Sequence, residues 1–215
     1  MSFSRTIIIS CAGVGNRLGL GTTKALVEVD GIPLILRHLK YLDDEPDIRV
    51  VVGFQAQKVI DVVKKYRKDV TFVFNHNYRE NGTGASVVLA AKYANEYILS
   101  LDGDLVVHPD DMKKILNCQH EFVGGTPAQT EDPWMLQTYT QDGKEFVSGF
   151  SRNNGNYEWN GLTQLKASRV VNGNGHVFQL IEPYLPLPFM NFRTREIDTT
   201  RDYEEAVKWV RSNFQ

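Results

Sequence analysis

The sequence predicts an α/β fold in which helices cover both faces of a mostly parallel sheet. Short apolar runs alternate with segments of helical period through residues 1–126. This alternation is typical of repeated βαβ units. A glycine-rich segment follows the first apolar run directly, and ligands of such sheets bind at the carboxyl ends of the strands. With 215 residues, the chain is expected to form a single domain, residues 1–215.

The first half supplies strands and helices in turn. Residues 6–10 are an apolar run typical of a buried strand, and further strands are predicted at 49–53, 70–75, 97–102 and 122–126. Helices are predicted between them at residues 34–42, 55–66, 86–94 and 109–117. The first of these helices ends before the acidic and proline-containing segment 43–46.

The second half has a different pattern. Residues 135–140 and 145–150 alternate in polarity around the turn 141–144, which predicts a hairpin. Another strand is predicted at 159–165. The last helix, 202–212, has Thr199 or Thr200 as its cap and acidic side chains in its first turn.

Composition excludes several classes of protein. The formal net charge is −2 and the pI is about 6.2, so neither a nucleic acid nor an anionic membrane is expected as a partner. No apolar stretch is long enough to span a bilayer, and a strand begins within a few residues of the first one, so neither membrane insertion nor a signal peptide is expected. The two cysteines, Cys11 and Cys118, lack metal-ligand spacing and fit a reducing cytoplasm.

The segment 10–35 has the composition of a polyphosphate-binding loop. Four glycines fall within about a dozen residues together with Arg17 and Lys24. Glycines let the backbone approach an anion closely and expose its N–H groups. A P-loop is excluded because Thr23 precedes the lysine, and Leu18 replaces the third glycine of the dinucleotide fingerprint. A purely structural glycine-rich turn is the alternative.

This segment resembles the signature of the nucleotidyltransferases that activate sugar phosphates and small alcohol phosphates. The signature, A-G-x-G-x-R-L followed by P-K-x-L-x-x-x-x-G-x-P-L-I, corresponds here to residues 12–18, 24–26 and 31–35. Cys11 replaces a usual alanine and Thr23 a usual proline. The resemblance implies a Rossmann-like three-layer α/β/α fold, the nucleotide-diphospho-sugar transferase fold. It divides the chain into a nucleotide-binding core (1–126), a small β-rich acceptor-binding insertion (127–195), and a metal motif with the terminal helix (196–215).

Two acidic segments suit a divalent cation. Asp102 and Asp104 close an apolar strand, and carboxylates at such a position suit Mg²⁺, although an ordinary Asp-Gly turn is the alternative. The segment 196–199 resembles the late E-I-D-(S/T) motif of bacterial CTP:phosphocholine cytidylyltransferases. The resemblance implies that Asp104 and Asp198 bind Mg²⁺ and that Asp102 lies on the nucleotide side. Helix capping is the alternative for Asp198.

The predicted nucleotide site combines the glycine loop with the segment 81–86. Helix starts present free N–H groups, which favour polar or anionic ligands. The resemblance implies nucleotide contacts at Cys11, Ala12, Gly13, Gly15, Gly82, Thr83, Ser86 and Asp102. Ser86 stands where several cytidylyltransferases have a cytosine-contacting serine, which favours CTP. An ordinary first-turn position in the helix is the alternative.

The predicted acceptor site depends on aromatic residues of the insertion, which are Trp134, Tyr139, Tyr157 and Trp159. Aromatic faces attract quaternary ammonium groups. Trp134 lies in a segment that resembles the Glu-Trp-Phe-Leu region of the phosphocholine enzymes, and Asn160 lies near the family's acceptor contacts. Core packing is the alternative for both tryptophans.

The resemblance implies cytidylyl transfer from CTP to a small phosphate monoester, such as phosphocholine, with release of pyrophosphate. Arg17 would hold the β- and γ-phosphates and Lys24 the α-phosphate, with Mg²⁺ as cofactor, and the product would serve surface-polysaccharide or lipid decoration. The alternatives are a uridylyl-, thymidylyl- or guanylyltransferase of sugar 1-phosphates, a silent nucleotide-binding module, and an NAD-dependent oxidoreductase, which Leu18 disfavours. The oligomeric state stays open, a homodimer included.

Overall fold

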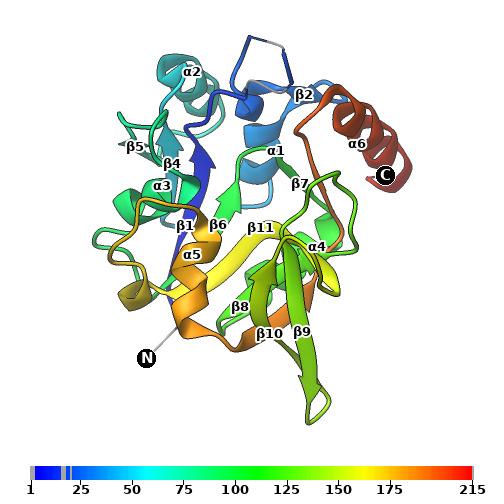
Figure 1. Cartoon of the computed structure of the whole chain (residues 1–215). Helices are drawn as coiled ribbons and strands as arrows, with labels where there is room; N and C mark the ends of the chain where they lie inside the picture. The colour runs from blue at the N-terminus through cyan, green and yellow to red at the C-terminus, as the bar shows by residue number, and fades with distance from the viewer. Residues whose placement is uncertain (1–2, 16–17, 20, 215) are drawn as a thin grey trace.

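The computed structural model describes residues 3–15, 18–19 and 21–214, and it confirms the predicted α/β class (Figure 1). One sheet of nine strands dominates, in the order β5-β4-β1-β6-β11-β8-β12-β10-β9. Only β10 and β11 run against the other strands of this sheet among the described residues, so it is mostly parallel in direction. Its strands are β1 (Arg5–Cys11), β4 (Ile48–Val52), β5 (Thr71–Phe74), β6 (Tyr97–Asp102), β8 (Phe122–Thr126), β9 (Met135–Gln141), β10 (Lys144–Ser151), β11 (Tyr157–Lys166) and β12 (Leu187–Asn191).

Helices cover both faces of this sheet, as predicted. On one face, α1 (Leu34–Leu39), α2 (Ala56–Tyr66) and α4 (Pro109–Asn117) share a buried cluster with Ile7 and Ile9. On the other face, α3 (Thr83–Ala90) and α5 (Val177–Ile181) share a second cluster with Ile8. Successive side chains of a strand point to opposite faces, so the run Ile7-Ile8-Ile9 anchors both layers at once.

The terminal helix α6 (Thr200–Asn213) lies outside these layers, beside β2 (Glu28–Val29) and β7 (Leu105–Val107) (Figure 1). Of the two predicted caps, Thr199 and Thr200, the structure has Thr199. Its hydroxyl accepts a hydrogen bond from the Asp202 backbone N–H, and the Asp202 carboxylate accepts one from the Thr199 N–H. Two short antiparallel ladders complete the fold, β2 with β3 (Ile32–Pro33) and β7 with β13 (Thr194–Glu196). Short 3-10 turns occupy 24–26, 167–169 and 182–184.

Several elements differ from the sequence-based expectation. Helix α1 ends at Leu39 rather than residue 42, and α3 spans 83–90 rather than 86–94. The predicted hairpin is confirmed as β9 and β10, with Asp142 and Gly143 at positive φ in its turn. The strand predicted at 159–165 is longer, and it enters the main sheet antiparallel between β6 and β8.

The carboxyl edge of the parallel strands carries the polar residues that the sequence singled out. Ser10 of β1 pairs in register with Asp102 of β6, so the glycine loop and the two aspartates of the 102–104 turn leave the sheet side by side. The carboxyl end of β4 pairs with the end of β5 at Val52 and Phe74. Across the described residues, no helix is both long and apolar enough to cross a membrane.

Candidate active site

A cavity of about 550 Å³ opens at this edge of the sheet. Most of the predicted site residues line it, namely Cys11, Ala12, Gly13, Gly15, Lys24, Gly82, Thr83, Ser86, Asp102, Asp104, Trp134, Trp159 and Asp198. Arg17 lies outside the described residues, so its predicted role stays a prediction. Asn160 is buried in an irregular stretch of β11 and is not among the residues that line this cavity. The geometry therefore gives the predicted acceptor role of Asn160 no support.

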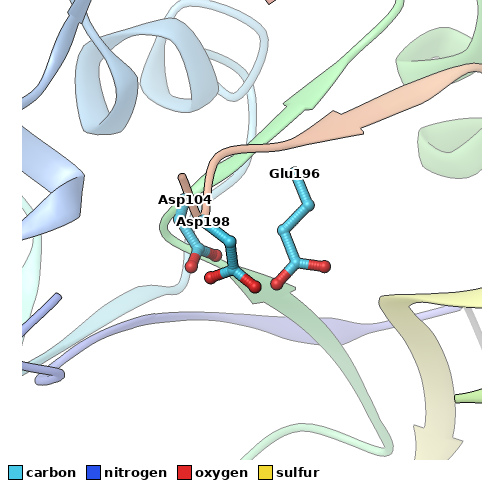
Figure 2. Close-up of side chains that lie close together, drawn as sticks. All are labelled: Asp104, Glu196 and Asp198. Atoms are coloured by element: carbon cyan, nitrogen blue, oxygen red, sulfur yellow. The ribbon is translucent and has the colours of Figure 1, made fainter. Parts of the chain in front are cut away.

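Three carboxylates converge on one point of the cavity, as Figure 2 shows. Asp104, Glu196 and Asp198 each offer an oxygen atom within 4.8 Å of the other two. Asp104 follows β6, whereas Glu196 ends β13 and pairs with Leu105 of β7. The Ile197 N–H also donates to the Asp104 carbonyl at 3.1 Å. Two acidic segments about ninety residues apart are thus joined by the β7–β13 ladder.

Lys24 meets this carboxylate cluster from the glycine loop. Its Nζ donates to Asp104 Oδ2 at 2.7 Å and also to Asp198 Oδ1. Burial opposes the charge of Lys24, but Asp104 and Asp198 outweigh that effect, so the pKa of Lys24 lies above its ordinary value. Gly15 has a φ of +68°, and a Cβ at that position would lie 2.9 Å from Lys24 Cγ. Glycine is therefore needed there for the lysine stem to pass.

Asp102, beside the cluster, and Glu196, within it, both hold their protons more tightly than usual. Burial and then the charge of Asp104 raise the pKa of Asp102 to about 8. Burial and then the charges of Asp104 and Asp198 raise the pKa of Glu196 well above its ordinary value. Within the described residues, Asp102 Oδ1 has no hydrogen-bond partner, and a Cβ on Gly161 would lie 2.3 Å from Oδ2. The cavity therefore concentrates negative potential at this point.

The donor set fits a hard divalent cation. Asp104, Glu196 and Asp198 offer oxygen ligands only, and Mg²⁺ prefers oxygen ligands and often takes few from the protein. Burial and then repulsion by Asp104 and Asp198 raise the pKa of Glu196, and a bound cation would relieve both effects. Cys11, which also lines the cavity, does not fit a soft metal, because burial raises the pKa of its thiol.

The start of α3 differs from the expectation that its N–H groups are free for a ligand. The Gly82 N–H donates to the Asn174 carbonyl and the Gly84 N–H to the Gly175 carbonyl, each at 2.9 Å. A Cβ on Gly82 would lie 2.3 Å from the Gly175 oxygen. These two glycines therefore allow close backbone packing. The prediction that their N–H groups are free to bind a ligand was wrong. Gly82, Thr83 and Ser86 still line the cavity.

The aromatic end of the cavity is only partly as predicted. Trp134 and Trp159 line it, whereas Tyr157 stacks on Phe189 and Tyr139 on Phe146, and neither tyrosine is among the lining residues. The Trp134 ring lies 4.2 Å from the Phe178 ring and 4.2 Å from the Arg152 guanidinium carbon. The Trp134 ring therefore already contacts a packed aromatic side chain and a cation of the protein itself.

Several polar residues that line the cavity were not predicted as site residues, among them Asn75, Arg152, Glu158 and Glu196. Glu158 is buried and accepts hydrogen bonds from the Gln129 N–H at 2.6 Å, the Thr130 N–H at 3.1 Å and the Thr130 hydroxyl at 2.7 Å. It fixes the loop that carries Trp134. Asn75 could have been found, because it is the last residue of a strand predicted at 70–75 and so lies at the ligand-binding edge.

Curated relatives match part of the chain. Bifunctional protein GlmU of Aliarcobacter butzleri is 33% identical over 113 residues, which are 51% of this chain and 26% of that protein. The bifunctional IPC transferase and DIPP synthase of Archaeoglobus fulgidus is 26% identical over 140 residues, 64% of this chain and 28% of that protein. The chain thus spans between a quarter and a third of the length of these curated relatives.

Solved structures share the fold over nearly the whole chain. The CTP:phosphocholine cytidylyltransferase LicC of Streptococcus pneumoniae superposes with a TM-score of 0.76 at 20% identity, covering 95% of this chain and 98% of that one. The inositol-1-phosphate CTP transferase from T. maritima gives 0.73 at 16% identity and covers 97% of both chains. The model of the MobA-like NTP transferase domain matches residues 7–140, more than half of the chain. The chain therefore belongs to the MobA-like NTP transferase domain family.

Proposed function

We propose that the protein is a Mg²⁺-dependent nucleotidyltransferase that moves a cytidylyl group from CTP to a small phosphate monoester and releases pyrophosphate. One observation carries the proposal. A single cavity holds the glycine loop, Lys24 and a cluster of three carboxylates, with aromatic side chains beyond them. Phosphoryl transfer needs a positive side chain, backbone N–H groups that bind an anion, and acidic groups that can hold a metal, all in one place.

The strand order suggests how the substrates lie along the cavity. Asn75 follows β5, Lys24 follows β1, Asp104 follows β6, and Trp159 lies on β11. Neighbouring strands are about 4.8 Å apart, so the ends of β5 and β6 are separated by about 14 Å. We infer that the base lies toward Asn75, the triphosphate at the glycine loop, and the acceptor toward Trp159.

The chemistry is an in-line displacement. An oxygen of the acceptor phosphate forms a bond to the α-phosphorus, the bond from that phosphorus to the bridging oxygen breaks, and pyrophosphate leaves with the electron pair. Lys24 neutralises charge that develops on the α-phosphate, because its ammonium is fixed at the carboxylate cluster. Magnesium held by Asp104, Glu196 and Asp198 would supply further charge neutralisation as a Lewis acid. No covalent enzyme intermediate is required.

CTP and a small alcohol phosphate, such as phosphocholine, are supported by three observations. Ser86 lines the cavity where we place the base, and Trp134 and Trp159 line it where we place the acceptor. The structures similar in fold include two proteins named as CTP-dependent transferases of phosphocholine and inositol 1-phosphate.

A cytoplasmic location is supported by Cys11 and Cys118, which are both free thiols.

The test is pyrophosphate release with MgCl₂, using each common nucleoside triphosphate against a panel of alcohol, amino-alcohol and sugar phosphates. We expect release with CTP and one alcohol phosphate, and none after chelation of the metal. A Lys24→Ala variant should lose about two to three orders of magnitude in turnover, as the loss of a transition-state charge stabiliser usually does. Pyrophosphate release with a sugar 1-phosphate and another nucleoside triphosphate would show that both proposed substrates, CTP and an alcohol phosphate, are wrong. Nucleotide binding without any release would make the chain a binding module.

A further inference from the structure

A buried pair of polar side chains, Asn75 and Ser86, lies at the end of the cavity where we place the base. Asn75 directly follows β5 and is 2% exposed, and Ser86 lies in α3 and is 4% exposed. Asn75 Nδ2 donates to Ser86 Oγ at 3.0 Å. Both residues line the cavity, so a ligand bound at this end would contact them.

The orientation of the Asn75 amide is fixed by the backbone. Its Oδ1 accepts a hydrogen bond from the Asn77 N–H at 3.1 Å. An N–H donor must face the amide oxygen and not the amide nitrogen, so the NH₂ group faces Ser86. The hydrogen bond between the two side chains therefore has one direction, from Asn75 to Ser86.

This direction determines what Ser86 offers a ligand. A hydroxyl has one proton and two acceptor positions, and Asn75 occupies an acceptor position. Among the described residues, no protein group accepts the proton of the Ser86 hydroxyl. The Ser86 hydroxyl therefore keeps its proton and one acceptor position for a ligand, and its proton is satisfied only when the ligand accepts it.

We propose that Asn75 is a positioning residue that keeps the Ser86 proton available to a ligand and thereby favours cytosine over uracil. The proposal rests on the proposed nucleotidyltransferase function. The two pyrimidines differ at the middle of their Watson–Crick edge, where N3 of cytosine accepts a hydrogen bond and N3 of uracil donates one. The Ser86 proton pairs with N3 of cytosine. With uracil, the hydroxyl must turn its remaining acceptor position to the N3–H, which leaves the Ser86 proton without an acceptor.

An Asn75→Asp variant tests the proposal by reversing the hydrogen bond. The carboxylate is nearly isosteric with the amide and still accepts from the Asn77 N–H. It cannot donate to Ser86, so the Ser86 hydroxyl donates to it and presents its oxygen to the base. We expect the ratio of kcat/KM for CTP over UTP to fall at least tenfold. The ratio of the two dissociation constants, measured by calorimetry without acceptor, should change in the same direction.

Two further variants make the result specific. Asn77 is exposed, so Asn77→Asp adds the same charge two residues away and should leave the CTP/UTP ratio unchanged. Ser86→Ala removes the donor without adding a charge, so its ratio should approach one, and it provides the same test if Asn75→Asp does not fold. A melting temperature for each variant checks the fold.

The outcomes separate this proposal from the proposed function. If the wild-type protein neither binds nor turns over any nucleoside triphosphate, the function itself is wrong. If it works with CTP but Asn75→Asp and Ser86→Ala keep the wild-type ratio, the function stands and the role of Asn75 is overturned. A wild-type preference for UTP, or an equal effect of Asn77→Asp, would also overturn that role.

Discussion

Replacing Lys24 by methionine tests the carboxylate cluster without any substrate. Methionine keeps an unbranched stem and loses the charge that bonds to Asp104 and Asp198. Two unit charges about 4 Å apart interact by about 4 kcal/mol at an effective dielectric constant of about 20. Removing one partner of a buried ion pair usually costs about 3–5 kcal/mol. The Lys24, Asp104 and Asp198 side chains are 13–19% exposed, and protonation of a carboxyl group limits the loss, so we expect about 2–3 kcal/mol.

The same variant should respond more strongly to a divalent cation. In the wild-type protein, a cation bound at the cluster would compete with the Lys24 ammonium for Asp104 and Asp198. In Lys24→Met that competition is absent, so Mn²⁺ should bind about tenfold more tightly without nucleotide, equivalent to about 1.4 kcal/mol. Manganese titration by electron paramagnetic resonance measures the affinity. Thermal unfolding with and without MgCl₂ measures the stabilisation that follows by mass action.

A matched control removes a lysine elsewhere. Lys114 pairs with Asp111 at 2.6 Å on α4 and is 61% exposed, so Lys114→Met should change neither stability nor the response to cations appreciably. Equal cation affinity in Lys24→Met and the wild-type protein would refute the reasoning, because it would mean that Lys24 does not compete for the cluster. An unchanged free energy of unfolding in Lys24→Met would refute the estimate that its ion pairs with Asp104 and Asp198 contribute to stability.

Three other changes have expected results. Burial lowers the pKa of His38 from 6.5 to about 4, so its contribution to stability is present above pH 6.5 and is lost as the pH falls toward 4. Urea unfolding should show that the free energy of unfolding falls by about 2 kcal/mol between pH 7 and pH 5. This fall should be absent in His38→Gln and unchanged in His76→Gln, because His76 is exposed. Glu158→Ala leaves the Gln129 and Thr130 donors unpaired and should cost about 3 kcal/mol, with faster proteolysis in 127–133 as a second readout. Gly82→Ala should separate α3 from residues 174–176 and lower the melting temperature more than Gly13→Ala, whose Cβ meets no atom within 4 Å.

The core of the fold could be predicted because its signals are local. Ile7-Ile8-Ile9 is buried on both faces, as the apolar run indicated. The place of β11 could not be predicted in this way. Alternation identifies a strand but not its neighbours, and the pairing of Thr163 with Ser100 depends on contacts between distant segments. Helix α5 has five residues, which is too short for a period of 3.6 to be detected.

Candidate site residues could be predicted where a local motif identifies them. They could not be predicted where backbone contacts with a distant segment determine their position. Asp104 and Asp198 were identified by motif, and both line the cavity. Glu196 was missed as a ligand because its place depends on the β7–β13 ladder. The amides of Gly82 and Gly84 were expected to be free, but carbonyls of residues 174–175, ninety residues later, accept from them. No local pattern contains that information.

The strand order explains why Lys24 meets Asp104 at all. From β1 the chain proceeds through β4 to β5 on one side, and then returns to β6 on the other side of β1. The direction of winding therefore reverses between β1 and β6, and such a switch point leaves a crevice at the carboxyl ends of the two strands. Lys24 belongs to the loop after β1 and Asp104 to the turn after β6, so the reversal forces them to the same crevice. A chain that kept Lys24 and both aspartates but placed β6 beyond β5 would separate these charges by several strand widths, and the cluster would not form.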